Sequence, residues 1–182
     1  MTTYNKIVIS GPSSSGKTTL GRRLSVICGV THIELDALHW EPGWTPAQPE
    51  VFRERVRQAL ARPTWIIDGN YGVVRDLTWG QAELMIWLDY PLPLVLWRLT
   101  RRTFQRRFRN EELWNGNREQ LRMFFFSRES LYLWVLKTHR RHRREYPAQF
   151  ASMPGLRVAR VRSPRELERL LRDLAPHLPR LS

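Results

Sequence analysis

The chain has 182 residues, of which 42 % are hydrophobic, and its formal net charge is +13. This length and apolar content exclude a disordered chain and predict a single domain, residues 1–182. No apolar run approaches the roughly 20 residues of a membrane span, and the first strand begins too early to leave room for a signal peptide. We therefore expect a cytoplasmic protein with no membrane partner. One cysteine, Cys28, excludes an intrachain disulfide and a cysteine-based zinc site.

Nearly all of the positive charge comes from arginine, because the chain has only three lysines, Lys6, Lys17 and Lys137. The arginine side chain is a planar fork that binds phosphate through two hydrogen bonds and keeps its charge at all working pH values. The composition therefore predicts anionic partners, although a compositional bias of the source genome would give the same excess of arginine.

The first predicted element is a short apolar strand over residues 6–10, and the octapeptide after it fits G-x-x-x-x-G-K-[ST], a phosphate-binding P-loop. Apolar residues then recur at helical spacing as far as Gly29, so strand, glycine loop and helix occur in the required order. A flexible Gly/Ser loop between unrelated elements is the alternative. Lys17 is expected to contact the β- and γ-phosphates as a catalytic residue, and Thr18 to ligate Mg²⁺. The residues predicted to bind ATP here are Gly11, Ser13, Ser14, Ser15, Gly16, Lys17, Thr18 and Thr19.

Strands and helices alternate along the rest of the chain. The pattern predicts a strand over 32–35 ending at Asp36, a helix around 47–61, and strands over 65–67, 84–88 and 156–161. Ser163 then begins a final helix, with the sequence of a capping box. This alternation predicts an α/β fold in which helices cover both faces of a parallel sheet.

Residues 91–146 form a long helical stretch that we interpret as an arginine-rich lid inserted into the domain. Arginines recur on one helical face at positions 98, 102, 106 and 109, and a second basic run covers residues 139–144. Arginines of a lid stabilise the charge of a transferred phosphoryl group. We expect catalytic roles for Arg98, Arg102 and Arg141, with Arg102 also contacting ATP, while most other arginines form a solvated face.

Three aspartates follow predicted strands, where ligands of parallel sheets bind. Asp68 is the residue expected to hold Mg²⁺ together with Thr18. Asp36 is expected to orient the acceptor or to serve as a second carboxylate of the metal site; a hydrogen bond within its loop is the alternative. Asp89 fits the cap of the next helix better than a metal site.

Two tryptophans, Trp40 and Trp44, lie in a Gly/Pro-containing segment just after Asp36. They are equally suited to stack on a planar acceptor and to cover the edge of the core. His39 is a weaker candidate for the same site.

Together these segments resemble a family of small P-loop kinases named DNA topology modulation proteins, which look like adenylate kinase. The resemblance rests on the P-loop and on residues 35–44, 65–71 and 87–91, with further similarity at 112–119 and 139–146. It covers nearly the whole chain. It implies the fold of a nucleoside-monophosphate kinase, with a five-stranded parallel sheet, a lid, and an acceptor-binding region after the second strand.

The resemblance also implies that Asp68-Gly69 matches the Asp-Gly of adenylate kinases, and that Arg162 lies near the base of ATP. The chain departs from adenylate kinases directly after this pair. Where they carry Phe-Pro-Arg, with the arginine on the acceptor phosphate, this chain has Asn70-Tyr71-Gly72. The departure argues against adenylate as the acceptor.

The leading interpretation is an ATP- and Mg²⁺-dependent kinase that acts on a nucleotide or another small metabolite, with a small anionic or planar acceptor. The alternative is an ATP-binding regulator that associates with nucleic acid through its basic surface. We favour it less, because the sequence has no recognisable nucleic-acid-reading module and its arginines cluster where a lid is expected. A nucleotide sensor without catalysis is a third interpretation.

Overall fold

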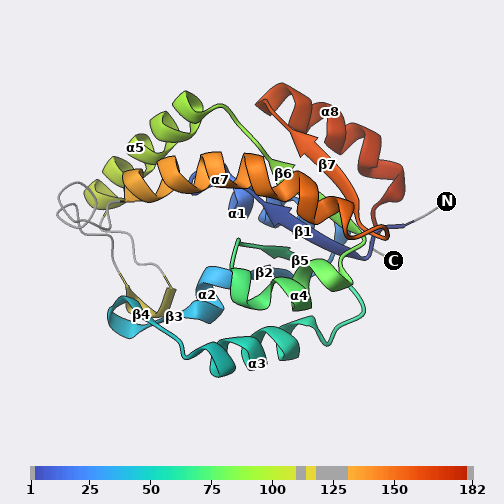
Figure 1. The fold of residues 1–182 in the computed structure, drawn as a ribbon, viewed down its shortest axis with the longest axis horizontal. Helices are drawn as coiled ribbons and strands as arrows, with labels where there is room; N and C mark the ends of the chain where they lie inside the picture. Colours follow the sequence, from blue (N-terminus) through green and yellow to red (C-terminus); the bar gives the residue numbers. More distant parts are fainter. Residues whose placement is uncertain (1–2, 110–113, 118–130, 180–182) are drawn as a thin grey trace.

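The computed structural model describes residues 3–109, 114–117 and 131–179, and its centre is a five-stranded parallel sheet (Figure 1). The order β2-β5-β1-β6-β7 places the strand before the P-loop in the middle. The central strands are apolar and buried on both faces, as parallel strands covered by helices require. The predicted fold class is confirmed. The strands are β1 (Lys6–Ser10), β2 (His32–Glu34), β5 (Trp65–Asp68), β6 (Leu84–Leu88) and β7 (Arg157–Val161).

Helices cover both faces of the sheet and build one apolar cluster on each (Figure 1). The cluster on one face includes residues of α1 (Lys17–Cys28), α5 (Leu92–Arg109) and α8 (Pro164–Leu174). The cluster on the other face includes residues of α3 (Pro49–Leu60) and α7 (Leu131–Ala151). β1 contributes side chains to both clusters, because successive side chains of a strand point to opposite faces of the sheet.

The structure contains several short elements that the sequence pattern did not predict. β2 ends at Glu34, so Asp36 lies in the short helix α2 (Leu35–His39) and not at the end of a strand. A hairpin follows, with β3 (Trp40–Glu41) and β4 (Thr45–Pro46) around the turn η1 (Pro42–Trp44). Such two-residue strands leave no periodic signal in a sequence. The other additions are short helical turns: η2 (Gly72–Val74), α4 (Arg75–Thr78), η3 (Trp79–Gln81) and η5 (Ala175–His177).

The predicted lid begins and ends in helices that belong to the core. Val95 and Leu99 of α5 and Val135 of α7 are fully buried in one apolar cluster. Between these helices, the structure describes only residues 114–117, which include the turn η4 (Trp114–Gly116). The remaining lid residues, 110–113 and 118–130, lie outside the described residues, so the lid stays a prediction. Within the described ranges, no helix is both long and apolar enough to span a membrane.

Asp89 does not cap α5, because two arginines bind its carboxylate. Its buried carboxylate accepts hydrogen bonds from Arg143 Nε at 2.6 Å and from Arg160 NH2 at 2.6 Å. Arg143 belongs to α7 and Arg160 to β7, so Asp89 ties both elements to the end of β6. The expectation of a helix cap was wrong because the partners that claim this carboxylate lie 54 and 71 residues away in the chain.

Candidate functional site

The loop between β1 and α1 is shaped to bind an anion. Ser14 and Gly16 have φ angles of 61° and 98°, and a Cβ on Gly11 would lie only 2.8 Å from the Leu88 carbonyl oxygen. α1 has no acidic residue in its first turn, and no side chain caps it. Its first N–H groups and the positive end of its dipole are therefore directed at whatever the loop encloses.

A cavity of about 780 Å³ opens at this loop and extends past it in two directions. On one side lie carboxylates from β2, α2 and β5, and on the other lie Tyr90 and the first residues of α8. Most of the residues predicted for the site are brought together here. The lining includes Ser13, Ser14, Ser15, Gly16, Lys17, Thr18, Thr19, Asp36, Asp68, Arg98 and Arg102.

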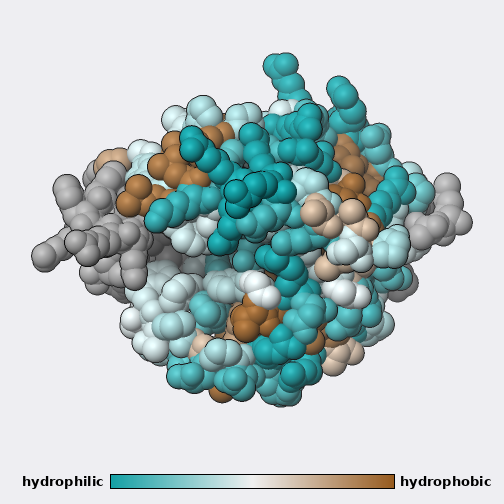
Figure 2. Space-filling model, in the orientation of Figure 1, coloured by the Kyte–Doolittle hydropathy of each residue, from teal (hydrophilic) through white to brown (hydrophobic). Residues whose placement is uncertain are grey.

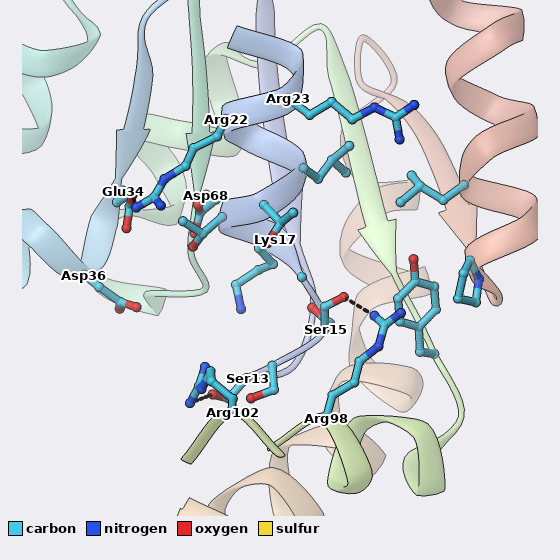
Figure 3. Close-up of a pocket in the computed structure, with 18 of the residues that line it drawn as sticks. Ser13, Ser15, Lys17, Arg22, Arg23, Glu34, Asp36, Asp68, Arg98 and Arg102 are labelled. Carbon is cyan, nitrogen blue, oxygen red and sulfur yellow. Dashed lines mark hydrogen bonds and ion pairs between the residues drawn. The ribbon is translucent and has the colours of Figure 1, made fainter. Parts of the chain in front are cut away.

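Lys17 occupies the centre of the site (Figure 3). Its side chain extends toward the space between Asp36 and Arg102, and its Nζ donates to the Pro12 carbonyl oxygen at 3.1 Å. Burial lowers the pKa of the Lys17 ammonium, while the charges of Asp68 and then Asp36 act in the opposite direction. An additional anion at this place would favour the charged ammonium further, as expected for a phosphate ligand.

Asp68 is 3 % exposed, and its Oδ2 lies 2.8 Å from His32 Nε2. The histidine reaches this position because Gly21 leaves room for it, since a Cβ there would lie 2.1 Å from His32 Nε2. The pair fixes the carboxylate at the end of β5, beside the first turn of α1. This is the place predicted for the metal-site carboxylate.

Asp36 is held by a tyrosine that the sequence did not single out. The hydroxyl of Tyr71 donates to Asp36 Oδ1 at 2.5 Å. Burial, followed by the charge of Asp36, raises the pKa of Tyr71, so the phenol keeps its proton and remains a donor. Asp36 Oδ2 has no hydrogen-bond partner among the residues that the structure describes, and it is available to an acceptor hydroxyl.

Asn70 connects the segment after β5 to the P-loop. Its Oδ1 accepts from Ser10 Oγ at 2.6 Å, and its Nδ2 donates to the Gly11 carbonyl oxygen at 2.5 Å. These bonds fix the chain where β1 turns into the loop. The run Asp68-Gly69-Asn70-Tyr71 thus carries the predicted metal-site carboxylate, binds the P-loop through Asn70 and binds Asp36 through Tyr71.

Two of the predicted lid arginines contact the P-loop. Arg98 NH1 donates to the Ser15 carbonyl oxygen at 2.9 Å, and its guanidinium lies 5.0 Å from the centre of the Tyr90 ring. Arg102 NH2 lies 3.4 Å from Ser13 Oγ. Both side chains project from α5, which places fixed positive charge over the loop (Figure 3).

The structure does not bring Arg141 or Arg162 to this cavity, and their roles stay predictions. Arg141 is exposed on α7 with its Nε 3.9 Å from Glu145 Oε2. At Arg162 the backbone N–H donates to Glu166 Oε2, while the neighbouring Pro164 lines the cavity. Arg141 is one of a row of exposed basic residues on α7, part of the hydrophilic face in Figure 2: Lys137, Arg140, Arg141 and Arg144.

Trp40 and Trp44 do not line the cavity. Their rings meet edge to face with centroids 5.6 Å apart, and His39 packs on Trp40, Phe52 and Tyr71. Through His39 these rings join an aromatic group that includes the core residue Phe52, and whether the tryptophans stack on an acceptor stays a prediction.

Several residues that line the cavity or contact its lining were missed by the sequence reasoning. Glu34 was placed in a strand without a role, and Trp114 was noted only as part of a family-like segment. Asn70 and Tyr71 had a usable signal, because they follow Asp68 directly at the phosphate end of the sheet. The contact between Glu34 and Trp114 leaves no such signal in the sequence, because 80 residues separate the two.

The chain is similar to known proteins both in sequence and in fold. No family model matches the chain. The uncharacterized protein YqaC of Bacillus subtilis (strain 168) is 30 % identical to it over 128 residues, which is 69 % of this chain and 71 % of YqaC. The chain belongs to the YqaC family. Because YqaC is uncharacterized, membership in this family assigns no reaction.

The chain is also similar to P-loop kinases. A shikimate kinase of Synechococcus elongatus is 30 % identical over 110 residues, 51 % of this chain and 56 % of that enzyme. The solved shikimate kinase from Acinetobacter baumannii, in complex with shikimate, matches 94 % of each chain with a TM-score of 0.58 at 16 % identity. The chain therefore has the fold of the small P-loop kinases.

Proposed function

We propose that the protein transfers the γ-phosphoryl group of ATP to a hydroxyl group of a small metabolite. The observation that carries this proposal is the position of Lys17 in one cavity, between the phosphate loop and the carboxylates Asp36 and Asp68. Asp36, which lines the same cavity as Lys17, is suited to orient an acceptor hydroxyl. The similarity to shikimate kinases supports the same class of reaction.

The donor side consists of the P-loop and α5. The loop N–H groups and Lys17 would bind the β- and γ-phosphates, and Arg98 and Arg102 would add positive charge above them. Tyr90, Pro164 and Leu167 form the part of the cavity farther from Asp36, which suits the base and ribose of ATP. The finer resemblance to adenylate-kinase-like DNA topology modulation proteins stays a prediction.

On the acceptor side, Asp36 would orient the attacking hydroxyl. The hydroxyl oxygen forms a bond to the γ-phosphorus while the bond from that phosphorus to the β–γ bridging oxygen breaks. ADP leaves with the bridging oxygen, and Asp36 receives the hydroxyl proton. The hydrogen bond from Tyr71 keeps the carboxylate in place during this step.

The residues present fit a Mg²⁺ ion bound in the usual manner of phosphoryl-transfer enzymes. Such an ion takes one or two protein oxygens, phosphate oxygens and water. Thr18, in the first turn of α1, and Asp68 both line the cavity and would hold it. At this place the ion would supply positive charge that offsets the negative charge of the phosphate oxygens.

The metal assignment predicts that Asp68→Asn impairs Mg²⁺-dependent turnover far more than it impairs ATP binding measured without metal. Asparagine keeps the shape beside His32 but removes the charge that attracts the ion. We expect the Mg²⁺ concentration for half-maximal rate to rise at least about tenfold, and titrations of rate against Mg²⁺ in both proteins measure it. Superimposable titration curves would exclude Asp68 from the metal site.

A pair of arginine variants separates the kinase from the nucleic-acid-associated regulator. Arg102 faces the phosphate loop, whereas Arg172 is exposed on α8. Arg102→Ala should lower turnover at least about tenfold, a barrier change of roughly 1.4 kcal/mol, and Arg172→Ala should leave it unchanged. Non-specific DNA binding depends on the total charge, so both variants should weaken it alike. Turnover and DNA retention across a salt series test this; equal losses of turnover would favour the regulator.

The acceptor is identified by a screen of ADP release from ATP and Mg²⁺. The panel contains shikimate, gluconate, neutral sugars, nucleosides and nucleoside monophosphates, each compared with water. We expect one class to raise ADP release well above the rate with water. A protein that binds ATP, yet releases ADP at one low rate with every compound, would contradict small-metabolite transfer for this panel.

A further inference from the structure

The tetrapeptide Trp114-Asn115-Gly116-Asn117 lies beside the hairpin β3–β4, although about 70 residues separate the two in sequence (Figure 1). It contacts α2, β3 and η1, the elements that follow the predicted acceptor carboxylate Asp36. It also follows α5, the helix that carries Arg98 and Arg102. The tetrapeptide therefore packs on the elements next to Asp36.

Both the oxygen and the nitrogen of the Asn117 side-chain amide form hydrogen bonds to the hairpin. Its Oδ1 accepts from the Trp44 N–H at 2.8 Å, and its Nδ2 donates to the carbonyl oxygens of Glu41 and Trp114, both at 2.9 Å. The residue is 3 % exposed. Removing the amide would leave partly buried backbone groups of the hairpin without these partners, which is costly.

The backbone conformation of the turn before Asn117 favours the asparagine and the glycine that occur there. Asn115 and Gly116 both have left-handed φ angles, 56° and 78°. Glycine and asparagine adopt this conformation more readily than other residues. Asn115 also donates from Nδ2 to the Trp40 carbonyl oxygen at 2.5 Å, which adds a third side-chain bond to the hairpin.

Trp114 lines the same cavity as Lys17 and Asp36. Its Nε1 donates to Glu34 Oε2 at 3.0 Å, and Arg22 NH2 donates to the other oxygen, Oε1, at 2.8 Å. These two bonds hold Glu34 at the cavity wall. They also fix the orientation of the indole, which gives this otherwise polar side of the cavity a flat apolar surface.

We propose that this tetrapeptide completes the acceptor side of the site, an inference that rests on the proposed kinase function. Asn117 is a positioning residue that holds the hairpin of residues 40–46 beside Asp36. Trp114 is a specificity-determining residue against which the acceptor packs. The acceptor class that fits is a hydroxyl compound with an apolar ring face, such as a sugar or nucleoside, since such a face packs on an indole while a hydroxyl reaches Asp36.

The positioning role is tested by hydrogen exchange on the full chain. In Asn117→Ala, the backbone amides of residues 40, 41 and 43–45 should exchange at least about tenfold faster than in the wild type, because local opening becomes easier. ATP affinity should stay within about twofold. Trp97→Ala, which removes an exposed tryptophan of α5, is the control and should change neither. Unchanged exchange at the hairpin in Asn117→Ala would overturn the positioning role.

The specificity role is tested by steady-state kinetics with ATP and the panel compound that the wild type phosphorylates. Trp114→Ala should raise the KM for that compound at least about tenfold and leave the KM for ATP unchanged. Trp114→Phe, which keeps a ring, should recover most of the loss. Equal KM values in Trp114→Ala and Trp97→Ala would overturn this role, as would preferred phosphorylation of an acyclic acceptor.

The two proposals fail in different ways. If the wild type binds no ATP, the kinase function is wrong, and hydrogen exchange still decides whether Asn117 holds the hairpin. If the wild type transfers phosphate while the Trp114 variants behave like the control, only the inference about the tetrapeptide is wrong.

Discussion

Replacing Lys17 by alanine should lower ATP turnover by at least about a hundredfold, the usual cost of removing a group that stabilises the developing charge at a phosphoryl centre. The loss is expected because the Lys17 side chain extends from the P-loop into the cavity that Asp36 and Asp68 also line, where its positive charge would contact the transferred phosphate (Figure 3). Turnover and the midpoint of thermal unfolding should be measured together, and the midpoint should change little.

Lys137→Ala is the matched control for this variant. It removes the same charge from an exposed position on α7, away from the cavity. Turnover in this control should equal that of the wild type. Near-normal turnover in Lys17→Ala would show that the P-loop does not act catalytically in this protein.

The second large effect is expected for Asp36→Asn. The amide keeps the shape and one oxygen for the Tyr71 hydroxyl, but it cannot take the proton of the acceptor. Transfer to the acceptor should fall at least about a hundredfold, while ATP affinity stays within about twofold. Initial rates of ester formation and direct ATP-binding measurements separate the two quantities.

Asp173→Asn on the exposed surface of α8 provides the comparison for Asp36→Asn. It carries the same chemical change without contact with the site and should behave as the wild type. If both variants transfer phosphate at the wild-type rate, Asp36 does not receive the acceptor proton, and another group must do so.

The sequence was sufficient to predict the fold because its signals are local. An apolar strand, a glycine loop and an amphipathic helix occur in direct succession, and β6 was predicted with its observed bounds. The donor half of the site follows from the same segment, since Lys17 and Thr18 are placed by the helix that begins at them. Asp68, which was predicted to hold Mg²⁺, lines the cavity because it ends a buried strand beside β1, and its role at the metal stays a prediction.

The predicted acceptor side of the site, around Asp36 and the hairpin of residues 40–46, depends on contacts between residues that are far apart in the sequence. Asp36 belongs to a five-residue helix, and its partner Tyr71 lies 35 residues away. The bonds from Asn117 to the hairpin span more than 70 residues. Charge alone was a poor guide as well, because Arg98 and Arg102 reach the loop whereas Arg141, in an equally basic segment, does not line the cavity.

The most direct test of the central claim is the fate of labelled phosphate. The wild type and Lys17→Ala are each incubated with [γ-³²P]ATP, Mg²⁺ and the acceptor panel, and the products are separated by chromatography. The account predicts that the wild type places the label in a stable phosphate ester of one acceptor class, and that Lys17→Ala forms almost none. Label that remains in ATP, or that appears only as inorganic phosphate at the same rate in both proteins, would contradict it.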